Sequence, residues 1–402
     1  MKSTDFSESV KSSRLQQITD SIVLGLSKSE KPLIVLGGGL RSSVDKQLID
    51  RMVKSLGVPC QRTRSALDLQ SDWDSLAAGR PGAYGQKFAN ELLYKSDYIL
   101  FLGCRLGESF IGRNPRVFAP DVLKCAVSLE LDTENQGYGL KNLKVFKEDL
   151  RTIVPNIEKS ISKVKLTSKT GWIETCIQLK NQELAKLRGD RIDGYGDWNL
   201  RDSINALSRA FPDECTILID GGHIVHVVNQ VFETKGNQRI ILPSGQTSPF
   251  FAIPALVGVA NSGFSRPIIA VTSTSALLKD LDLIDRIMNS LPRHRRVHIF
   301  AFEMTHYSSW TLAKGYLYPL TGLQLLEIER QSSRIGLLPS VNHLGLRLPN
   351  DLDQISSNEF WQRPGLTICE LAFGMDLDIS PRPRYRVALD GSWIQDPLNV
   401  MD

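Results

Sequence analysis

The sequence predicts two doubly wound α/β domains in tandem, each built around a parallel β-sheet. Short apolar runs recur along both halves of the chain, and most of them stop at glycine or aspartate. Stretches with helical spacing separate these runs. Strands that are apolar on both faces and alternate with helices are typical of parallel sheets covered on both sides. With 402 residues, the chain is long enough for two such domains.

The first predicted domain follows a polar arm and a short helix within residues 1–30, where Leu15, Ile18, Ile22 and Leu26 have helical spacing. The first strand is expected over residues 32–36, because this apolar run ends at three glycines and a helical stretch follows. Further strands are expected over residues 98–102 and 125–131. These units assign residues 31–165 to the first domain.

The connection and the second domain follow from a change in composition. Residues 158–195 are richer in Lys, Ser, Thr and Gly, which is typical of a linker, and a helix is expected within them around residues 172–187. We assign residues 166–195 to this linker. The alternation of strands and helices restarts after it, so residues 196–402 are assigned to the second domain. Its strands are expected over residues 216–219, 267–271, 297–302 and 366–371. The proline- and arginine-rich tail around residues 381–386 is expected to be a surface extension.

Composition and charge exclude several classes of protein. The 48 Lys and Arg residues nearly balance 44 Asp and Glu, and a net charge of +4 is too small for a dedicated nucleic-acid binder. Six cysteines form no CxxC pair, which fits a reduced cytoplasmic protein. No apolar run approaches the roughly 18 residues of a membrane-spanning helix, and the polar start of the chain is unlike a secretory signal. We expect neither nucleic acid nor membrane as a partner.

Three glycines, Gly37, Gly38 and Gly39, stand where a dinucleotide-binding turn would, after a strand and before a helix. Ser42 replaces the last glycine of the usual fingerprint, and no acidic residue ends the next strand. A turn that only reverses the chain is therefore the preferred interpretation. The alternative is a nucleotide whose phosphates would face the start of the following helix.

Other local patterns identify no reaction, and no catalytic residue is assigned. His223 and His226 are spaced i, i+3 beside Asp220, but no third soft ligand for a metal accompanies them. The basic segment 292–296 lacks interleaved aromatic residues, which favours a solvated loop over RNA binding. The GxSxG motif of serine hydrolases is absent from the sequence.

Several segments match one protein family in the same order along the chain. They are Lys31–Gly39, Gly82–Gly85, Ser96–Leu106, Leu129–Asp132 and Glu148-Asp149 in the first half, and Ile219–His223, Ser244–Ser248 and Pro254–Ala260 in the second. In this order they resemble thiamine-diphosphate-dependent enzymes of the acetolactate synthase type. The resemblance implies the family's Rossmann-like central domain over residues 31–165 and its diphosphate-binding domain over residues 196–402.

The resemblance implies thiamine diphosphate and Mg²⁺ as cofactors, but the metal-binding motifs differ. Where the family has Gly-Asp-Gly, this sequence has Ser273-Thr274-Ser275, and where the family has Asn-Asn it has Glu303-Met304. Thr274 offers a neutral hydroxyl in place of the family's carboxylate, and Glu303 could restore one charge as a metal ligand. On the diphosphate side the resemblance also implies the loop residues Ser244, Gly245, Gln246 and Thr247. We expect a weakened magnesium site and weakened cofactor binding.

The family's activating glutamate lies in an N-terminal pyrimidine-binding domain, and only about 30 residues precede the central domain here. We therefore expect that domain to be absent, and two hypotheses remain open. The chain is either a degenerate, non-catalytic relative or accessory subunit, or one half of a split carboligase or 2-oxo acid decarboxylase completed by a separate pyrimidine-domain chain. The resemblance also implies a homodimer or higher oligomer. A further alternative is FAD or an adenine nucleotide bound by the central domain through Gly37–Gly39 and Arg105.

Overall fold

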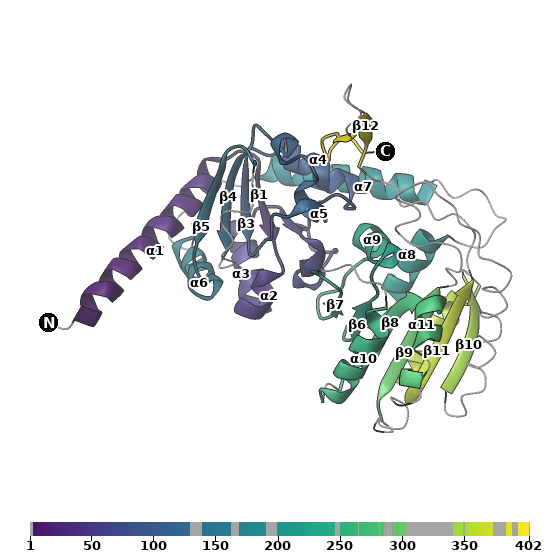
Figure 1. The fold of residues 1–402 in the computed structure, drawn as a ribbon. Coiled ribbons are helices and arrows are strands. Elements are labelled where there is room, and N and C mark those ends of the chain that lie inside the picture. Colours follow the sequence, from purple (N-terminus) through teal and green to yellow (C-terminus); the bar gives the residue numbers. More distant parts are fainter. Residues whose placement is uncertain are drawn as a thin grey trace. The chain divides into compact units, whose positions relative to one another are not determined.

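The computed structural model describes residues 3–128, 139–161, 169–189, 199–245, 250–263, 265–280, 282–284, 286, 292, 294–302, 341–348, 350–372, 383–387 and 393–401. The chain divides into two compact units, Met1–Arg191 with Ser380–Asp402, and Ile192–Ile379 (Figure 1). Each unit contains a parallel sheet with flanking helices, one of five strands and one of six. The predicted fold class of two doubly wound parallel-sheet domains in tandem is confirmed.

The sheet of the first unit has the strand order β2-β1-β3-β4-β5, with every neighbouring pair parallel. Its strands are β1 (Pro32–Leu36), β2 (Cys60–Arg62), β3 (Tyr98–Leu102), β4 (Leu123–Ser128) and β5 (Leu143–Lys147). The two central strands, β1 and β3, are buried along their whole length, as expected for runs that are apolar on both faces. The run expected over 125–131 is observed as β4 up to Ser128, and residues 129–131 lie outside the described residues.

Helices cover both faces of this sheet. The helices and 3₁₀ turns are α1 (Ser3–Lys28), α2 (Gly39–Ser43), α3 (Lys46–Leu56), η1 (Arg64–Leu69), α4 (Lys87–Lys95), α5 (Glu108–Ile111), η2 (Pro115–Val117), α6 (Leu150–Ile161) and α7 (Thr170–Gly189). Apolar side chains of α1, α3 and α6 form the core on one face, and those of α4, α5 and α7 form the core on the other. Gly57 ends α3 in the left-handed conformation that glycine adopts most readily.

Most of the segment expected to be a linker is helix α7, and it packs on the first unit. Trp172 is 6% exposed, and its indole Nε1 donates a hydrogen bond to the carbonyl of Pro32 at 2.9 Å. The Lys180 ammonium donates to the Asp72 carbonyl at 2.6 Å. An amphipathic face buried against a sheet explains why this polar segment is helical.

The C-terminal tail also groups with the first unit, although the sequence division placed it with the second domain. Strands β12 (Tyr385–Val387) and β13 (Trp393–Gln395) form an antiparallel hairpin. Beyond it, the Leu398 N–H donates to the Tyr94 hydroxyl at 3.1 Å, and Lys87 Nζ donates to the Met401 carbonyl at 2.9 Å. The last residues of the chain therefore dock on helix α4, whereas strand β12 is exposed.

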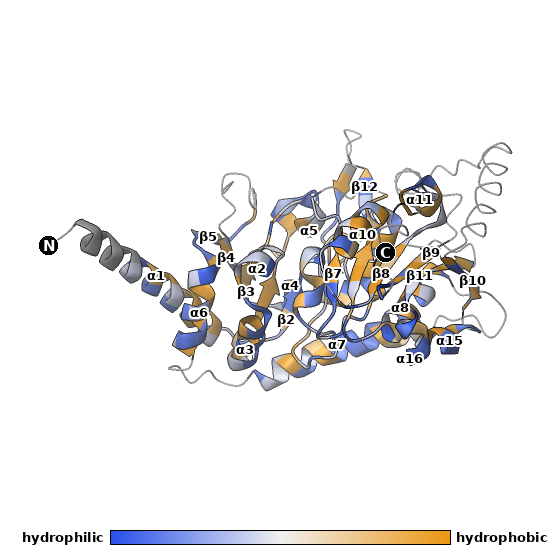
Figure 2. Cartoon of the chain, turned by 90° about the horizontal axis from the view of Figure 1, so that it is seen from below, coloured by the Kyte–Doolittle hydropathy of each residue, from blue (hydrophilic) through white to orange (hydrophobic). Residues whose placement is uncertain are grey.

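The sheet of the second unit has the order β10-β11-β9-β8-β6-β7, again parallel throughout. Its strands are β6 (Thr216–Ile219), β7 (Arg239–Ile241), β8 (Ile268–Ser273), β9 (Arg296–Phe302), β10 (Val341–Arg347) and β11 (Gly365–Ala372). The described helices are α8 (Leu200–Ala210), α9 (His223–Val231), α10 (Ala252–Asn261), α11 (Thr274–Lys279), α15 (Leu352–Ser356) and α16 (Asn358–Gln362). Figure 2 shows the hydrophobic character of the central strands β8 and β9.

Within the described segments, none of the helices combines the length and the apolar character that crossing a membrane requires.

Candidate functional site

In each sheet the strand order reverses at one point, so that the next strand along the chain lies on one side of the first strand and the later strands lie on its other side. Open α/β sheets usually bind ligands at this point. In the second unit it lies between β6 and β8, because β7 lies on one side of β6 and the strands from β8 onward lie on the other. The residues that follow these two strands at the carboxyl edge are Asp220 and the predicted site residues Ser273 to Ser275. Sequence and topology therefore indicate the same region.

Asp220 is the buried carboxylate at this edge, with 2% of its surface exposed. Its Oδ1 accepts hydrogen bonds from the backbone N–H groups of Gly221 at 2.9 Å and Phe251 at 2.7 Å. Its Oδ2 accepts a hydrogen bond from the Thr272 hydroxyl at 2.7 Å. The carboxylate therefore ties the end of β6 to the end of β8 and to the start of α10, and both of its oxygens are occupied by donors of this chain.

The hydroxyl residues after β8 serve the start of helix α11. Ser273 is the N-cap, and its Oγ accepts a hydrogen bond from the Ala276 N–H at 3.2 Å. The Ser273 and Ser275 hydroxyls lie 3.0 Å apart. Thr274 is 5% exposed. These side chains stabilise a helix end, since a serine N-cap satisfies a backbone donor that would otherwise lack a partner.

The loop between β7 and α10 approaches the same edge. Ser244 and Gly245 are exposed after β7, whereas Gln246 and Thr247 lie outside the described residues. Phe250 has φ of +66°, which is uncommon for a bulky residue, and the next residue donates to Asp220. The Lys279 ammonium lies 4.1 Å from the centre of the Phe250 ring. The predicted diphosphate-side residues are thus described only in part.

The described residues at this edge do not fit a magnesium–diphosphate site. Mg²⁺ takes near-octahedral oxygen ligands that usually include a free carboxylate. Here both oxygens of Asp220 already accept hydrogen bonds from donors of this chain, and Thr274 offers only a buried neutral hydroxyl. In the described part of the chain, no three His, Cys, Asp or Glu side chains gather closely enough to hold a metal ion. The second predicted metal ligand, Glu303, lies outside the described residues, as does Met304.

In the first unit, the corresponding point lies between β1 and β3, where the Gly37–Gly39 turn meets Gly103. The Gly37 N–H donates to the Leu102 carbonyl at 2.8 Å, and the Gly39 N–H donates to the Gly103 carbonyl at 3.0 Å. A Cβ on Gly37 would lie 2.1 Å from the Gly103 oxygen. Close backbone packing therefore accounts for Gly37 without a ligand, and two N–H groups of the turn already have acceptors. Arg105, the other predicted nucleotide contact, is exposed.

The two histidines singled out in the sequence lie on α9. His223 is 3% exposed at the start of the helix, and His226 is half-buried one turn later. All six cysteines are buried thiols without disulfide bonds. Burial raises the pKa of Cys215 and of Cys369 to about 12, which keeps these thiols protonated and unreactive at neutral pH.

A buried charged cluster in the first unit was not anticipated from the sequence. Asp72 accepts hydrogen bonds from two guanidinium groups, those of Arg62 and, at 2.6 Å, of Arg80. Arg62 is completely buried, and Arg80 is 1% exposed. Satisfied buried ion pairs of this kind fix loops in place. The sequence gives no signal for this cluster, because Arg62 ends strand β2 whereas Asp72 and Arg80 lie in irregular segments, and no motif joins them.

The two units, each built around a parallel sheet with flanking helices, define a tandem α/β protein. Residues 19–145 match the family model described as thiamine pyrophosphate enzyme, central domain. This match covers strands β1 to β4 of the first unit and the beginning of β5. The boundaries predicted from the sequence, 31–165, overlap most of it.

Acetolactate synthases are among the curated proteins that the chain is similar to. It is 26% identical over 238 residues to the acetolactate synthase large subunit of Lactococcus lactis, which covers 58% of this chain and 39% of that protein. It is 21% identical over 255 residues to the probable acetolactate synthase large subunit of Methanocaldococcus jannaschii, covering 63% of this chain and 43% of the relative. Isozyme 1 of Escherichia coli is 19% identical over 268 residues.

The chain is therefore similar to the thiamine-diphosphate-dependent enzymes of the acetolactate synthase type, the family that the ordered motifs indicated. The aligned part spans about two fifths of the length of the relatives it matches.

Proposed function

We propose that this chain is an acetolactate-synthase-like protein that does not bind thiamine diphosphate and Mg²⁺ in its second unit and that acts as a non-catalytic accessory protein. The observation that supports this proposal is the carboxyl edge between β6 and β8. There both oxygens of the Asp220 carboxylate accept hydrogen bonds from backbone and hydroxyl donors, and the Ser273 hydroxyl caps helix α11. The relatives are named large subunits, which agrees with a role beside another chain.

The turn after β8 lacks a negative charge that the family has at this position. In the family the central residue of this turn is an aspartate that binds Mg²⁺, whereas Thr274 is neutral and buried. Removing one partner from a buried charged cluster costs about 3–5 kcal/mol. Since 1.4 kcal/mol is tenfold in affinity, cofactor binding falls by roughly two to three and a half decades. A dissociation constant of about 1 µM would then become roughly 0.1–3 mM.

Isothermal titration calorimetry with thiamine diphosphate and Mg²⁺ tests the proposal. The purified chain is expected to give no binding heat at micromolar concentration, while the Lactococcus lactis relative, titrated in the same buffer, serves as the positive control. Circular dichroism of the chain verifies that it is folded during the titration. Magnesium-dependent binding of thiamine diphosphate with a micromolar dissociation constant would overturn the proposal.

A second candidate function is one half of a split carboligase or 2-oxo acid decarboxylase. The observation that favours it is the intact frame of the site: six parallel strands, with β6 and β8 adjacent at the ligand-binding point. Mixing the chain with the separately expressed pyrimidine-binding domain of a relative, followed by an assay of pyruvate consumption, separates the two functions. Turnover that needs both chains supports the split enzyme, and the absence of turnover supports the accessory protein.

We also propose that the chain forms a homodimer or a higher oligomer, as the resemblance implies. Light scattering coupled to size-exclusion chromatography measures the molar mass directly. A mass of 44.9 kDa, that of one chain, would contradict this part of the proposal.

A further inference from the structure

Strands β12 and β13, with the residues that follow them, form a small folded element on the first unit (Figure 1). Besides the pairing of the two strands, the Asp396 N–H donates a hydrogen bond to the Arg384 carbonyl at 2.9 Å. Pro383 and Met401 form an antiparallel bridge. We call residues 383–401 the docking segment, of which residues 383–387 and 393–401 are described. Its internal hydrogen bonds preorganise it for docking.

The first anchor of the docking segment is Gln395, which is 4% exposed. Its Oε1 accepts a hydrogen bond from the Arg113 N–H at 2.9 Å. Gly112 makes room for this side chain, because a Cβ on the glycine would lie 2.2 Å from Gln395 Nε2. The φ of Gly112 is +83°, a value that glycine adopts readily. The turn after α5 is thus shaped around one side chain of the docking segment.

The second anchor is Leu398, three residues further along the segment. It is 1% exposed and belongs to the hydrophobic core that α4, α5 and α7 form on their face of the sheet. Its N–H donates to the Tyr94 hydroxyl at 3.1 Å, and this hydroxyl donates to the Val117 carbonyl at 2.9 Å. Burial of the leucine is the main apolar contribution of the segment to docking.

The third anchor is Met401, again three residues further, and it is 3% exposed. Its carbonyl accepts a hydrogen bond from Lys87 Nζ at 2.9 Å, and its sulfur accepts one from Asn90 Nδ2 at 3.1 Å. Asn90 is completely buried and is held by both backbone groups of Gly82, at 2.8 and 3.0 Å. Val400, between the anchors, is 40% exposed. Every third residue from 395 to 401 is therefore bound by the first unit.

The residues that bind these anchors form the receiving surface: Lys87, Asn90, Tyr94, Gly112 and Arg113. Lys87 begins α4, and residues 112–113 follow α5. Helices that connect parallel strands begin at the carboxyl edge of the sheet, which is the edge where open α/β sheets usually bind ligands. The docking segment therefore joins two loops at the carboxyl edge of the first unit.

The chain reaches the docking segment only after it has formed the second unit. Residues 192–379 separate the segment from the rest of the first unit. The effective concentration of the segment at the receiving surface is therefore set by the whole second unit and not by a short connection. Such a segment can be released locally while the sheet stays folded.

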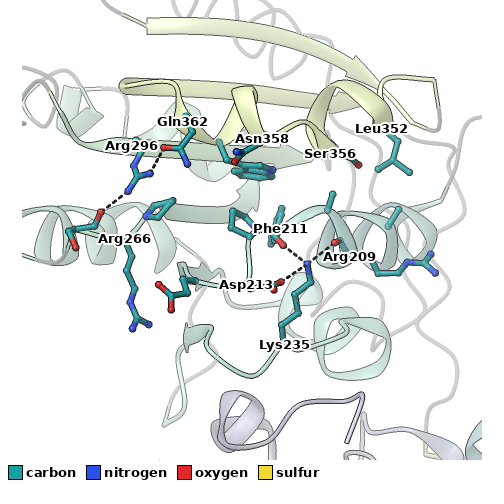
Figure 3. A pocket seen from close by; sticks show the side chains of 17 residues that line it. Arg209, Phe211, Asp213, Lys235, Arg266, Arg296, Leu352, Ser356, Asn358 and Gln362 are labelled. Carbon is teal, nitrogen blue, oxygen red and sulfur yellow. Dashed lines mark hydrogen bonds and ion pairs between the residues drawn. The ribbon is translucent and has the colours of Figure 1, made fainter.

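The pocket in the second unit has no comparable set of contacts for a ligand. It measures about 770 Å³ and lies at the amino-terminal edge of the sheet, between α8, α15, α16 and the loops before β6 and β8 (Figure 3). The rings of Phe211 and Trp361 line it but are only 1% and 4% exposed, so a ligand could not reach them. Lys235 donates to the carbonyls of Arg209 and Phe211, and Arg296 hydrogen-bonds to two other walls. These two cations hold the walls together.

We propose that the receiving surface is a peptide-binding site, that the docking segment is its resident ligand, and that reversible docking controls the order of the carboxyl-edge loops of the first unit. The class of ligand follows from the anchors, which are an amide, a branched apolar side chain and a thioether at every third residue. While docked, the segment covers this surface, so another chain can reach it only after release. The proposal is independent of cofactor binding in the second unit.

Hydrogen exchange of the full chain measures the release. Leu398→Asp places a charge where the apolar anchor is buried and should undock the segment. The Arg113 amide then loses its acceptor, so its exchange and that of amides at the start of α4 should become about tenfold faster or more. Amides of α1 and α6, which pack on the other face of the sheet, should keep their wild-type rates. Val400→Asp is the matched control, because it adds the same charge at an exposed position and should leave all rates unchanged.

A synthetic peptide of residues 393–402 tests whether docking is a binding event. Added to the Leu398→Asp variant, it should restore slow exchange at Arg113, whereas a peptide with the same substitution should not. Leu398→Ala replaces the aspartate variant if circular dichroism shows that the latter is unfolded. Unchanged exchange at Arg113 and at the start of α4 in the folded variant would overturn the proposal. So would a loss of protection throughout the first unit, or failure of the wild-type peptide to restore protection at millimolar concentration.

Discussion

Acid should destabilise the second unit through one buried histidine. His298 lies on β9 and is completely buried. Its ring packs against those of Phe360 and Trp361, with both centroid distances 5.0 Å. Burial lowers the pKa of His298 to about 4, and the positive charges of Arg296 and Arg363 act in the same direction. The Trp361 backbone opposes this shift without cancelling it.

The size of the effect follows from the difference in pKa between the two states. The unfolded chain has the ordinary histidine pKa of 6.5, and the folded value is about 4. Each pKa unit corresponds to about 1.4 kcal/mol, so the histidine changes the free energy of unfolding by about 3 kcal/mol. At a pH between these two values, the unfolded state binds more protons than the folded state. The contribution is therefore fully present above pH 6.5 and is lost as the pH falls towards 4.

Urea unfolding followed by tryptophan fluorescence, repeated from neutral pH to about pH 4, measures this loss. The variant His298→Leu removes the titrating ring. Between neutral pH and about pH 4, its free energy of unfolding should fall by about 3 kcal/mol less than that of the wild type. The exposed His294, changed to Gln, is the control and should retain the wild-type pH dependence. Parallel curves for the wild type and His298→Leu would refute the reasoning.

Three further changes test the structure. Asp72→Asn should lower the free energy of unfolding by about 3–5 kcal/mol, because two buried guanidinium groups lose their anion. A loss below about 1 kcal/mol in a urea titration would contradict this prediction. Gly37→Ala should strongly lower the melting temperature, because the added Cβ would meet the Gly103 carbonyl. Gly171→Ala is the control: no atom lies within 4 Å of its added Cβ, so this change should be neutral or stabilising. Ser273→Ala should cost about 1 kcal/mol and speed amide exchange in α11, and unchanged exchange would show that this cap is dispensable.

The central strands of both sheets could be predicted from the sequence, because they are continuous apolar runs that end at glycine or at polar residues. The edge strands β5, β7 and β10 were not predicted, and β2 was expected only as the strand that follows the glycine turn. In β2, the polar Gln61 is buried because its amide donates to the carbonyls of Ala78 and Ala89, and no local pattern reveals this. Strand β5 lies at the edge of the sheet and is only partly buried, so its apolar signal is weak.

Site residues that are close together in the sequence could be predicted, whereas contacts between distant segments could not. Ser273 and Thr274 follow a clear strand, so their place at the carboxyl edge of the sheet could be expected. The hydrogen bond from the Thr272 hydroxyl to Asp220 joins residues 52 positions apart. It forms because β6 and β8 are neighbours in the sheet. The pocket beside Trp361 combines five segments of the chain. Only the tertiary structure brings such segments together.

The docking of the tail on helix α4 makes the second unit an insertion within the first. The chain leaves the first unit near Arg191 and returns near Ser380, so the two ends of the insertion are anchored in one folded body. If the second unit unfolds while the first stays folded, its whole length becomes a closed loop, and a closed loop has less conformational entropy than a free chain. The two units thus stabilise each other through connectivity alone. For the same reason, the second unit can be excised as one continuous segment, whereas the first unit needs both of its segments to be complete.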